Sequence, residues 1–465
     1  MLPCFRYDPG MKEFYFTELL SKFDRGGRCA CACGREHGIG TREVIVGRDA
    51  LRESAALLSK MYGSAPVLWV LSDENTEEAA GMKWKSPLRV SRIVSRVLPA
   101  DPKPVPTLEL VNELAAGVKK ESPDLLVCVG SGVISDLVKK VSLDTGVPNW
   151  CVATAASVDA YSSATSAIRV AGYHEALPTR VSEAIICDLD VIAKAPRALF
   201  LSGLGDLLAK FIANLDWNLS HIMTGEHYCP MLADFALGSA RKALDAARGD
   251  SRDPLETARA LTDAVLVSGF AMQALNGSRP AASAEHTVAH FWEMAGAVGN
   301  EELDLHGILV GAASRIVLEG YAPYYGKLTQ ALPEAARRLE GLAREPGWEE
   351  SLEKGLMPFK GKILAEMRGR SYDAALLSRR LETFRIRRDR ITGIAGPLLS
   401  ELTSAVGTLS RMDFPFSLDR LGITGAARAI PLRNVRLLRN RYTTFDLAYE
   451  LGNDGELLEG MAVSR

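Results

Sequence analysis

The chain has 465 residues, of which 47% are hydrophobic and 24% charged, and its formal net charge is -2 at pH 7. A globular chain of this length is expected to form two domains. The near-neutral charge excludes the basic footprint of a nucleic-acid-binding protein and gives no electrostatic attraction to a membrane surface. We expect a small-molecule partner, no nucleic acid and no membrane span.

The N-terminal region lacks a basic segment followed by an apolar stretch, which predicts a cytoplasmic protein. Eight cysteines are too sparse for a disulfide framework in a chain of this length. One cluster could hold a metal: Cys29, Cys31 and Cys33, with His37 nearby. Alternating cysteines point to opposite faces of a strand and lack C-x₂-C spacing, so a reduced strand is favoured here over a structural zinc.

Between about residues 42 and 196, short apolar runs alternate with helical patterns. Runs typical of strands buried on both faces cover residues 43–46, 66–71, 125–129, 150–154 and 184–187. Strands separated by helices predict a mostly parallel sheet. Later periodicity is helical, over residues 199–221, 231–247 and 254–275, and the charged stretch 328–390 is typical of exposed amphipathic helices. These patterns predict an α/β Rossmann-like domain over residues 1–198 and an all-α domain over 199–465.

A candidate nucleotide site follows the strand predicted at residues 125–129, where Gly130, Ser131 and Gly132 lead into a helix that includes Asp136. Such a turn places backbone N–H groups and the positive end of the helix dipole where a pyrophosphate can bind. The third glycine of the G-x-G-x-x-G fingerprint is absent, so the turn also fits an ordinary strand-to-helix connection. Upstream, Asp73 could accept hydrogen bonds from a ribose and favour NAD over NADP, or it could cap a helix.

Three potential metal ligands follow one another along the chain: Asp206, His286 and His306. One carboxylate and two neutral imidazoles suit Zn²⁺, Fe²⁺ or Ni²⁺ and leave coordination positions open for a substrate, which indicates catalysis. His290 shares a helical face with His286, four residues earlier. Lys210 lies one helical turn after Asp206; this pair could be a surface ion pair or could serve a ligand in apolar surroundings.

With these residues, the chain resembles the dehydroquinate synthase-like superfamily, which includes iron-containing alcohol dehydrogenases and glycerol dehydrogenases. Within it, the chain is most similar to bacterial sn-glycerol-1-phosphate dehydrogenases. The resemblance runs from Cys33 to Gly452, and its most specific stretches are residues 205–217 and 277–294. It implies an NAD-binding α/β domain followed by a helical domain that binds metal and substrate.

The resemblance also implies roles for the residues of the metal centre. It implies that Asp206, His286 and His306 bind one divalent ion, with zinc, nickel and iron as the candidates. His290 would lie beside the substrate instead of completing the metal shell. Lys210 stands where some metal-dependent relatives carry a fourth ligand, which suits an anion-binding role.

For the cofactor, the resemblance implies that Thr154 and Ser157 contact NAD and that Asp159 meets the substrate hydroxyls. Two residues of this region depart from the family pattern. Ser131 stands where relatives usually have a glycine, and Ala153 replaces a common proline. We therefore expect the local backbone geometry, and with it the affinity for the cofactor, to differ from those of the relatives.

The leading hypothesis from this resemblance is reversible reduction of dihydroxyacetone phosphate by NADH to glycerol 1-phosphate. His290, with Asp159, is the candidate for relaying a proton. Lys210 and Arg279 are the candidates for holding the substrate phosphate. The alternatives are a glycerol dehydrogenase or other metal-dependent alcohol dehydrogenase, a dehydroquinate synthase-like lyase, and a non-catalytic binding protein. Relatives commonly form dimers or larger assemblies, so we expect a homo-oligomer.

Overall fold

The computed structural model describes residues 4–7, 14–24, 26–248, 253–299, 304–328, 354–367 and 374–461. The chain forms two compact units, one of residues 1–207 with 230–280, the other of residues 208–229 with 281–465. Helix α8 (Arg197–Thr224) runs from the first unit into the second. The first unit also takes in α9 (Pro230–Arg248) and α10 (Pro254–Leu275), so this division differs from the boundary at 198/199, which stays a prediction.

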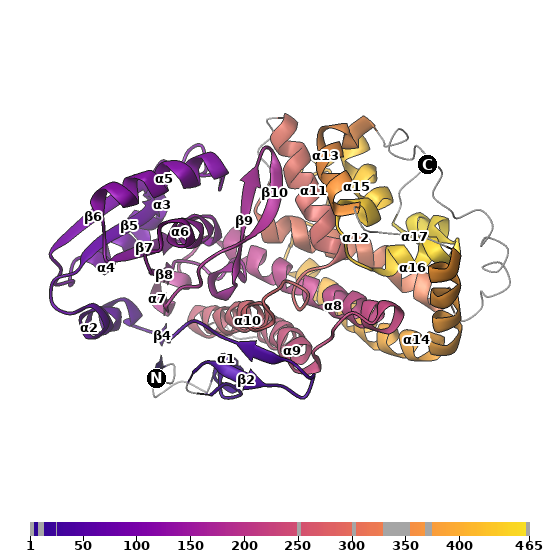
Figure 1. Cartoon of the computed structure of the whole chain (residues 1–465), viewed down its shortest axis with the longest axis horizontal. Helices are drawn as coiled ribbons and strands as arrows, with labels where there is room; N and C mark the ends of the chain where they lie inside the picture. Colours follow the sequence, from indigo (N-terminus) through magenta and orange to yellow (C-terminus); the bar gives the residue numbers. More distant parts are fainter. Residues whose placement is uncertain are drawn as a thin grey trace. The chain divides into compact units, whose positions relative to one another are not determined.

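A seven-stranded sheet forms the centre of the first unit, in the order β1-β4-β11-β8-β7-β5-β6 (Figure 1). All its neighbouring strands pair in parallel. The strands are β1 (Cys4–Tyr7), β4 (Glu43–Gly47), β5 (Val67–Asp73), β6 (Arg92–Leu98), β7 (Leu125–Gly130), β8 (Asn149–Ala153) and β11 (Ala184–Asp188). The five expected strands are confirmed, each within two residues of its predicted ends, as is the α/β class of this region.

Helices cover both faces of this sheet (Figure 1). On one face, α2 (Ala50–Tyr62) packs on β4 and β11, and the indole of Trp84 in α4 (Met82–Lys85) donates a hydrogen bond to Ser54 Oγ at 2.9 Å. On the other face, α6 (Gly132–Thr145) packs on β7 and against α5 (Leu108–Glu121). Strands buried on both sides need apolar residues at successive positions, which is why continuous apolar runs identified them.

The strand order reverses between β5 and β7. From β5 the chain goes outward to β6 at the edge, and it then returns through α5 to β7 on the other side of β5. Asp73 ends β5 and Gly130 ends β7, so the two predicted nucleotide-binding turns are neighbours at this point. Ligands of open α/β sheets bind outside the carboxyl ends of the strands at such a reversal.

The first unit carries two antiparallel hairpins besides the main sheet. One pairs β2 (Arg28–Ala30) with β3 (Glu36–Gly38), and the other pairs β9 (Thr165–Val170) with β10 (Tyr173–Pro178). The remaining short elements of this unit are α1 (Tyr15–Leu20), α3 (Glu74–Thr76), η1 (Glu77–Gly81), η2 (Ala160–Ser162) and α7 (Leu189–Ile192).

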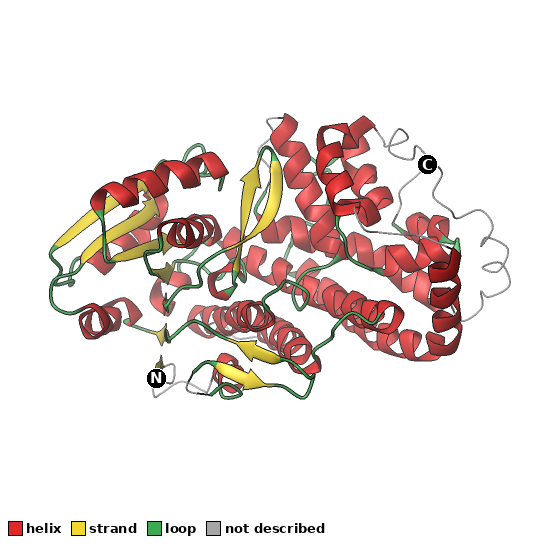
Figure 2. Cartoon of the chain, in the orientation of Figure 1, coloured by secondary structure: helices red, strands yellow, loops and turns green. Residues whose placement is uncertain are grey.

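In the second unit, every described element is a helix (Figure 2). They are the C-terminal part of α8 and then α11 (Ala284–Gly299), α12 (His306–Lys327), η5 (Lys354–Phe359), α13 (Lys360–Met367), α14 (Ala374–Arg411), α15 (Gly425–Leu438), α16 (Thr444–Leu451) and α17 (Asp454–Gly460). The predicted helical half is confirmed. Much of the charged stretch 328–390, including residues 329–353, lies outside the described residues.

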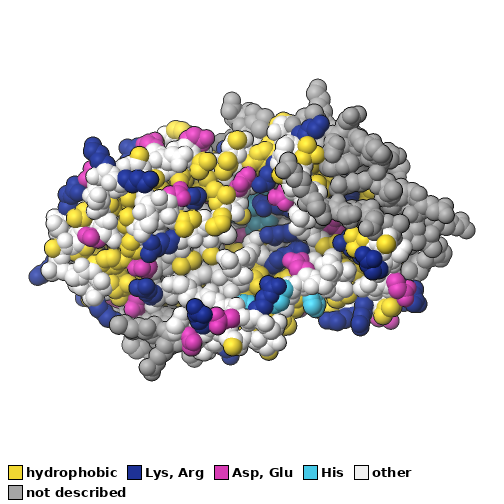
Figure 3. Space-filling view, in the orientation of Figure 1, with side chains coloured by type: hydrophobic (Ala, Val, Ile, Leu, Met, Phe, Trp, Pro, Cys, Tyr) yellow, Lys and Arg dark blue, Asp and Glu magenta, His cyan; other side chains and the backbone are white. Residues whose placement is uncertain are grey.

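One described helix, α8, is long and apolar enough to cross a membrane by length and composition alone, which we did not expect. However, 83% of its most apolar window is buried inside the protein, and core helices pass the same test. Acidic and basic side chains are interspersed among hydrophobic ones over the face seen in Figure 3, in keeping with the net charge of -2.

Candidate active site

The predicted site residues fall in both units. The first unit holds those assigned to the cofactor and several others: Asp73, Gly130, Ser131, Gly132, Asp136, Thr154, Ser157, Asp159, Asp206 and Arg279. The second unit holds Lys210, His286, His290 and His306.

The glycine turn has the geometry of a strand-to-helix phosphate loop. β7 ends at Gly130, Ser131 is extended at φ -90° and ψ -166°, and α6 starts at Gly132. A Cβ on Gly130 would lie 2.6 Å from Ile134 Cβ, so only glycine fits there. The N–H of Thr154 donates to the Gly130 carbonyl at 3.2 Å, which brings the end of β8 beside the turn. The N-terminus of α6 and the residue after β8 therefore lie together, as binding of a dinucleotide requires.

Two acidic residues assigned to the cofactor also have structural roles. Asp73 Oδ1 accepts from the N–H of Thr76 at 2.8 Å and forms a capping box at the start of α3, which was the alternative interpretation of this residue. Asp136 accepts from the N–H of Ala167 at 3.1 Å and pairs with Lys139 Nζ at 3.3 Å. Burial raises the pKa of Asp136, and the nearby Lys139 opposes this shift. Their contacts with a cofactor stay predictions.

Asp159 and Asp206 are held together within the first unit. The N–H of Asp159 donates to Asp206 Oδ2 at 3.1 Å, and Asp159 Oδ2 accepts from Ser268 Oγ at 2.7 Å. Both carboxylates are buried, with Asp206 only 1% exposed. Sequence reasoning missed Ser268 because it lies 109 residues from Asp159, within an apolar stretch of α10.

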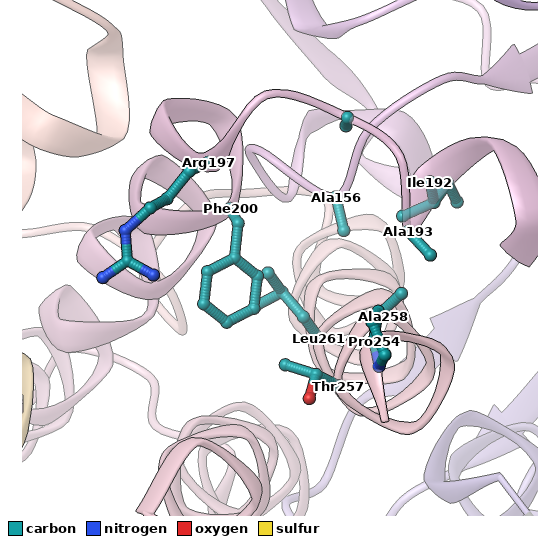
Figure 4. Close-up of a pocket in the computed structure, with 10 residues that line it drawn as sticks. Ala156, Ile192, Ala193, Arg197, Phe200, Pro254, Thr257, Ala258 and Leu261 are labelled. Carbon is teal, nitrogen blue, oxygen red and sulfur yellow. The ribbon is translucent and has the colours of Figure 1, made fainter. Parts of the chain in front are cut away.

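The first unit also contains a pocket of about 350 Å³ (Figure 4). Its lining is mainly apolar, and it includes Ala156, which lies between Thr154 and Ser157 in the chain. The other labelled lining residues come from the end of α7, the start of α8 and the start of α10, and Arg197 extends away from them. An apolar pocket beside this stretch suits a flat aromatic group better than a charged one.

Three histidines form one cluster in the second unit. The ring centroids of His286 and His306 lie 5.5 Å apart, and His290 lies 5.8 Å from His286 and 5.3 Å from His306. His286 and His290 are one turn apart on α11, and His306 begins α12, which packs against α11. The spacing of His286 and His290 on one helix could be predicted from the sequence. The proximity of His306 to them depends on the packing of α12 against α11.

Each of two histidines is oriented by a glutamate. Glu285 Oε1 lies 2.9 Å from His286 Nδ1, and Glu293 Oε1 lies 2.8 Å from His306 Nδ1. A carboxylate accepts the Nδ1 proton, so each imidazole presents the lone pair of Nε2. Metal-binding histidines are oriented in this way. Two such imidazoles together with a carboxylate are a donor set that fits Zn²⁺, Fe²⁺ or Ni²⁺.

His290 has a different partner. Arg439 Nη2 lies 3.4 Å from His290 Nδ1. A guanidinium can only donate, so Nδ1 of His290 accepts and Nε2 carries the proton. His290 therefore presents an N–H group where its two neighbours present a lone pair. This contrast supports a proton-donating role over metal binding, although ligand atoms of His290, Glu293 and His306 also lie within 4.8 Å of one another.

Two cations contact the turn that precedes α11. Lys210 Nζ donates to the carbonyl of Ala281 at 3.3 Å, and Arg441 Nη1 donates to the carbonyl of Ala282 at 2.7 Å. Lys210 is fully buried. Sequence reasoning identified Lys210 but missed Arg439 and Arg441, which lie about 150 residues after the histidines and carry no local signal.

Asp216 fixes the elements around this cluster. Its carboxylate accepts from Ser283 Oγ at 2.7 Å, from the N–H and Oγ1 of Thr444 at 3.0 and 2.9 Å, and from the hydroxyl of Tyr321 at 3.2 Å. Ser283 immediately precedes α11, and Thr444 begins α16, three residues after Arg441. Asp216 thereby positions both the turn before α11 and the segment that carries Arg439 and Arg441.

Because Asp216 is buried, we expect a defined effect of pH on stability. Burial raises the pKa of this carboxyl from 3.8 to about 6, and the hydrogen bonds from Ser283 and Thr444 oppose the rise. The folded state then binds the proton more tightly than the unfolded state, so this group favours folding at low pH and loses its contribution as pH rises through about 6. Asp216→Asn removes this titration. As the pH rises from about 4.5 to 7, the free energy of unfolding of the variant should therefore gain roughly 2 kcal/mol relative to that of the wild type. Urea unfolding at both pH values measures the change, and parallel shifts of both proteins would contradict it.

Comparisons with known proteins agree with this architecture. A family model described as iron-containing alcohol dehydrogenase matches residues 45–196. The chain is 31% identical over 307 residues to a glycerol-1-phosphate dehydrogenase [NAD(P)+] of Bacillus licheniformis, which covers 64% of this chain and 75% of that protein. It is 28% identical over 291 residues to the protein of that name from Pyrococcus furiosus, covering 63% and 82% of the two chains.

Solved structures share the fold. A probable glycerol dehydrogenase from Sinorhizobium meliloti superimposes with a TM-score of 0.54 at 16% identity, covering 92% of this chain and 99% of that one. Glycerol dehydrogenase from Schizosaccharomyces pombe gives a TM-score of 0.52 at 16% identity, with 91% of each chain covered. The fold, the described site and the sequence relatives lead to one assignment: the chain belongs to the glycerol-1-phosphate dehydrogenase family, within the iron-containing alcohol dehydrogenase superfamily.

Proposed function

We propose that the protein catalyses the reversible reduction of dihydroxyacetone phosphate to sn-glycerol 1-phosphate with a reduced nicotinamide cofactor. The observation that carries the proposal is the pair His286 and His306, each held by a glutamate, in a chain whose relatives bear the name of this activity. When bound, a divalent ion supplies Lewis-acid polarisation of the substrate carbonyl, and the nicotinamide supplies the hydride.

We assign the ion to Asp206, His286 and His306, and we keep zinc, nickel and iron as its candidates. The dinucleotide is assigned to the turn at residues 130–132 together with Thr154 and Ser157, with Asp136 nearby. Asp73, at the end of the neighbouring strand, is the proposed contact to the ribose. Its role as a helix cap uses Oδ1, and a carboxylate has acceptor capacity for further hydrogen bonds.

Proton transfer is assigned to His290 and Asp159. Reduction of a ketone to an alcohol requires one proton at the carbonyl oxygen in addition to the hydride. His290 carries its proton on Nε2 because Arg439 faces Nδ1. Asp159, fixed by Ser268, is the proposed acceptor of hydrogen bonds from the substrate hydroxyl.

The phosphate is assigned to Lys210 and Arg441, two cations that contact consecutive carbonyls of one turn. An ammonium attracts a phosphate as a point charge, and a planar guanidinium matches a phosphate bidentately. Arg279, which is 8% exposed and belongs to the first unit, remains a third candidate. This cluster of cations favours a phosphorylated substrate over glycerol or dihydroxyacetone.

The test follows NADH absorbance with dihydroxyacetone phosphate, dihydroxyacetone and, in the reverse direction with NAD, glycerol and glycerol 1-phosphate. We expect rapid turnover of the phosphorylated pair and weak turnover of the others. Equal rates with and without phosphate would indicate a glycerol dehydrogenase. A substrate consumed without net oxidation of NADH would indicate a lyase, and protein that binds neither metal nor nucleotide would indicate a non-catalytic role.

For His290→Ala we expect kcat to fall by about 10²- to 10⁴-fold, the usual contribution of a positioned general acid. Bound metal should stay at the wild-type level, because His290 presents an N–H group and no lone pair at Nε2. Metal analysis of the purified variant beside steady-state kinetics tests both points. Loss of the metal would instead make His290 a ligand.

Two further expectations concern the protein in the cell. We propose that it works in the cytoplasm and assembles as a dimer or larger homo-oligomer. Light scattering of the purified chain and fractionation of cells test these points directly.

A further inference from the structure

The first hairpin of the chain brings together side chains that the proposed activity does not use. Strand β2 ends at Ala30, so Cys31 and Cys33 lie in the turn that leads to β3 and not in a strand. In this turn the N–H of Gly34 donates to the carbonyl of Cys31 at 3.0 Å, and Gly34 has a φ of +85°, which favours glycine. Strand alternation therefore does not direct these two cysteines to opposite faces.

The turn cysteines converge on His37. One ligand atom from each of Cys31, Cys33 and His37 lies within 4.8 Å of the others, and Cys33 Sγ is 3.2 Å from His37 Nε2. Ligands around one tetrahedral zinc, with bonds of about 2.0 to 2.3 Å, are separated by roughly 3.3 to 3.8 Å. These atoms are therefore close enough to share one ion after small side-chain shifts.

The orientation of His37 supports metal binding independently. His37 Nδ1 lies 3.2 Å from the carbonyl of Ala274 in α10, and the imidazole is almost completely buried. A carbonyl can only accept, so Nδ1 carries the proton and the lone pair of Nε2 is directed to the cysteines. A histidine held through Nδ1 by a backbone carbonyl is the arrangement that orients metal ligands.

We propose that Cys31, Cys33 and His37 bind a structural metal ion, for which Zn²⁺ is the best match. Thiolates together with imidazole select zinc over the hard cations. A structural site is closed by four ligands. One further donor besides these three side chains therefore completes the coordination.

The ion would hold together the turn of a hairpin that already contacts α10 through hydrogen bonds. Beside the His37 contact, Gln273 of α10 accepts from the N–H of Gly40 at 2.7 Å and donates to Thr41 Oγ1 at 3.2 Å. Three strand residues on each side of a hairpin bury little apolar surface, so a metal crosslink can supply the missing stability. Because this site differs from the proposed catalytic centre in ligands, it can be tested separately.

The experiment uses the full chain loaded with Co²⁺. The proposed catalytic ligands contain no sulfur, so a thiolate-to-cobalt charge-transfer band in the near ultraviolet reports on the cysteines alone. We expect the band in the wild type and in His286→Ala, and its loss in the double variant Cys31→Ser with Cys33→Ser. Cys29→Ser, on the adjacent strand, is the matched control and should keep the band.

A second measurement covers the case in which the double variant does not fold. Zinc bound to the wild-type chain should be released when a mercurial reagent modifies its thiols, and His286→Ala should still contain one releasable zinc ion per chain. The proposal is overturned if wild-type protein gives no thiolate band, if the band survives loss of both cysteines, or if fresh protein holds a Cys31–Cys33 disulfide. Absence of reductase activity would leave each of these readouts intact.

Discussion

His286→Ala is expected to abolish most of the activity and to remove the catalytic metal. Stabilisation of developing charge by a bound ion contributes several kcal/mol, and each 1.36 kcal/mol corresponds to a factor of ten in rate. The variant should therefore lose about 10³-fold or more in kcat/KM. Metal analysis and NADH oxidation with dihydroxyacetone phosphate measure both effects on the same preparation.

His221→Ala is the matched control for this experiment. His221 lies on α8, and its Nδ1 is 2.7 Å from the carbonyl of Glu226, so it has a partner outside the cluster. We expect this variant to keep both metal and rate. Glu285→Gln should have a rate between those of the two histidine variants. Its metal affinity should be weakened by about 10- to 100-fold, because the ring of His286 loses the carboxylate that orients it. If His286→Ala retained metal and rate, the assignment of the ligands would be wrong.

Local patterns predicted the five inner strands of the sheet well because these strands are buried on both faces. β7 and β8 consist of consecutive buried residues, and such runs are visible in the sequence. The edge strand β6 was missed because most of its residues are exposed or half-buried and include charged and polar side chains. The short hairpin β2/β3 was interpreted as one strand, since the alternating cysteines continue past the end of β2 at Ala30.

The site was predicted only in part, because some of its residues are close in sequence and others meet only through tertiary packing. His286 and His290 share a helix, so their spacing reveals that they lie on one face. Glu285 is the sequence neighbour of His286, but its role becomes clear only from the hydrogen bond between its Oε1 and the imidazole of His286. Arg439 and Arg441 reach the site because α15 packs on α11 and Asp216 anchors the start of α16. Such tertiary contacts leave no periodicity in the sequence.

Arg441→Gln is expected to change the choice of substrate. The arginine would provide a charged, bidentate contact to the phosphate, and truncating one partner of a buried charged pair costs about 2 to 5 kcal/mol. For dihydroxyacetone phosphate, kcat/KM should then fall by about 30-fold or more, mostly through KM. For dihydroxyacetone, which has no phosphate, the rate should change little. Lys210→Gln should act in the same direction, because its ammonium contacts the same turn.

The comparison between dihydroxyacetone and its phosphate distinguishes phosphate recognition by Arg441 from a structural role of this arginine. Arg441 also donates to the carbonyl of Ala282, so its loss could disturb the turn before α11 and slow every substrate equally. Arg433→Gln, an exposed arginine on α15, controls for the removal of one positive charge from this region and should leave both rates unchanged. An equal loss with dihydroxyacetone and its phosphate in Arg441→Gln would assign the arginine to holding the turn. A selective loss places the phosphate beside it, because only that group distinguishes the two substrates.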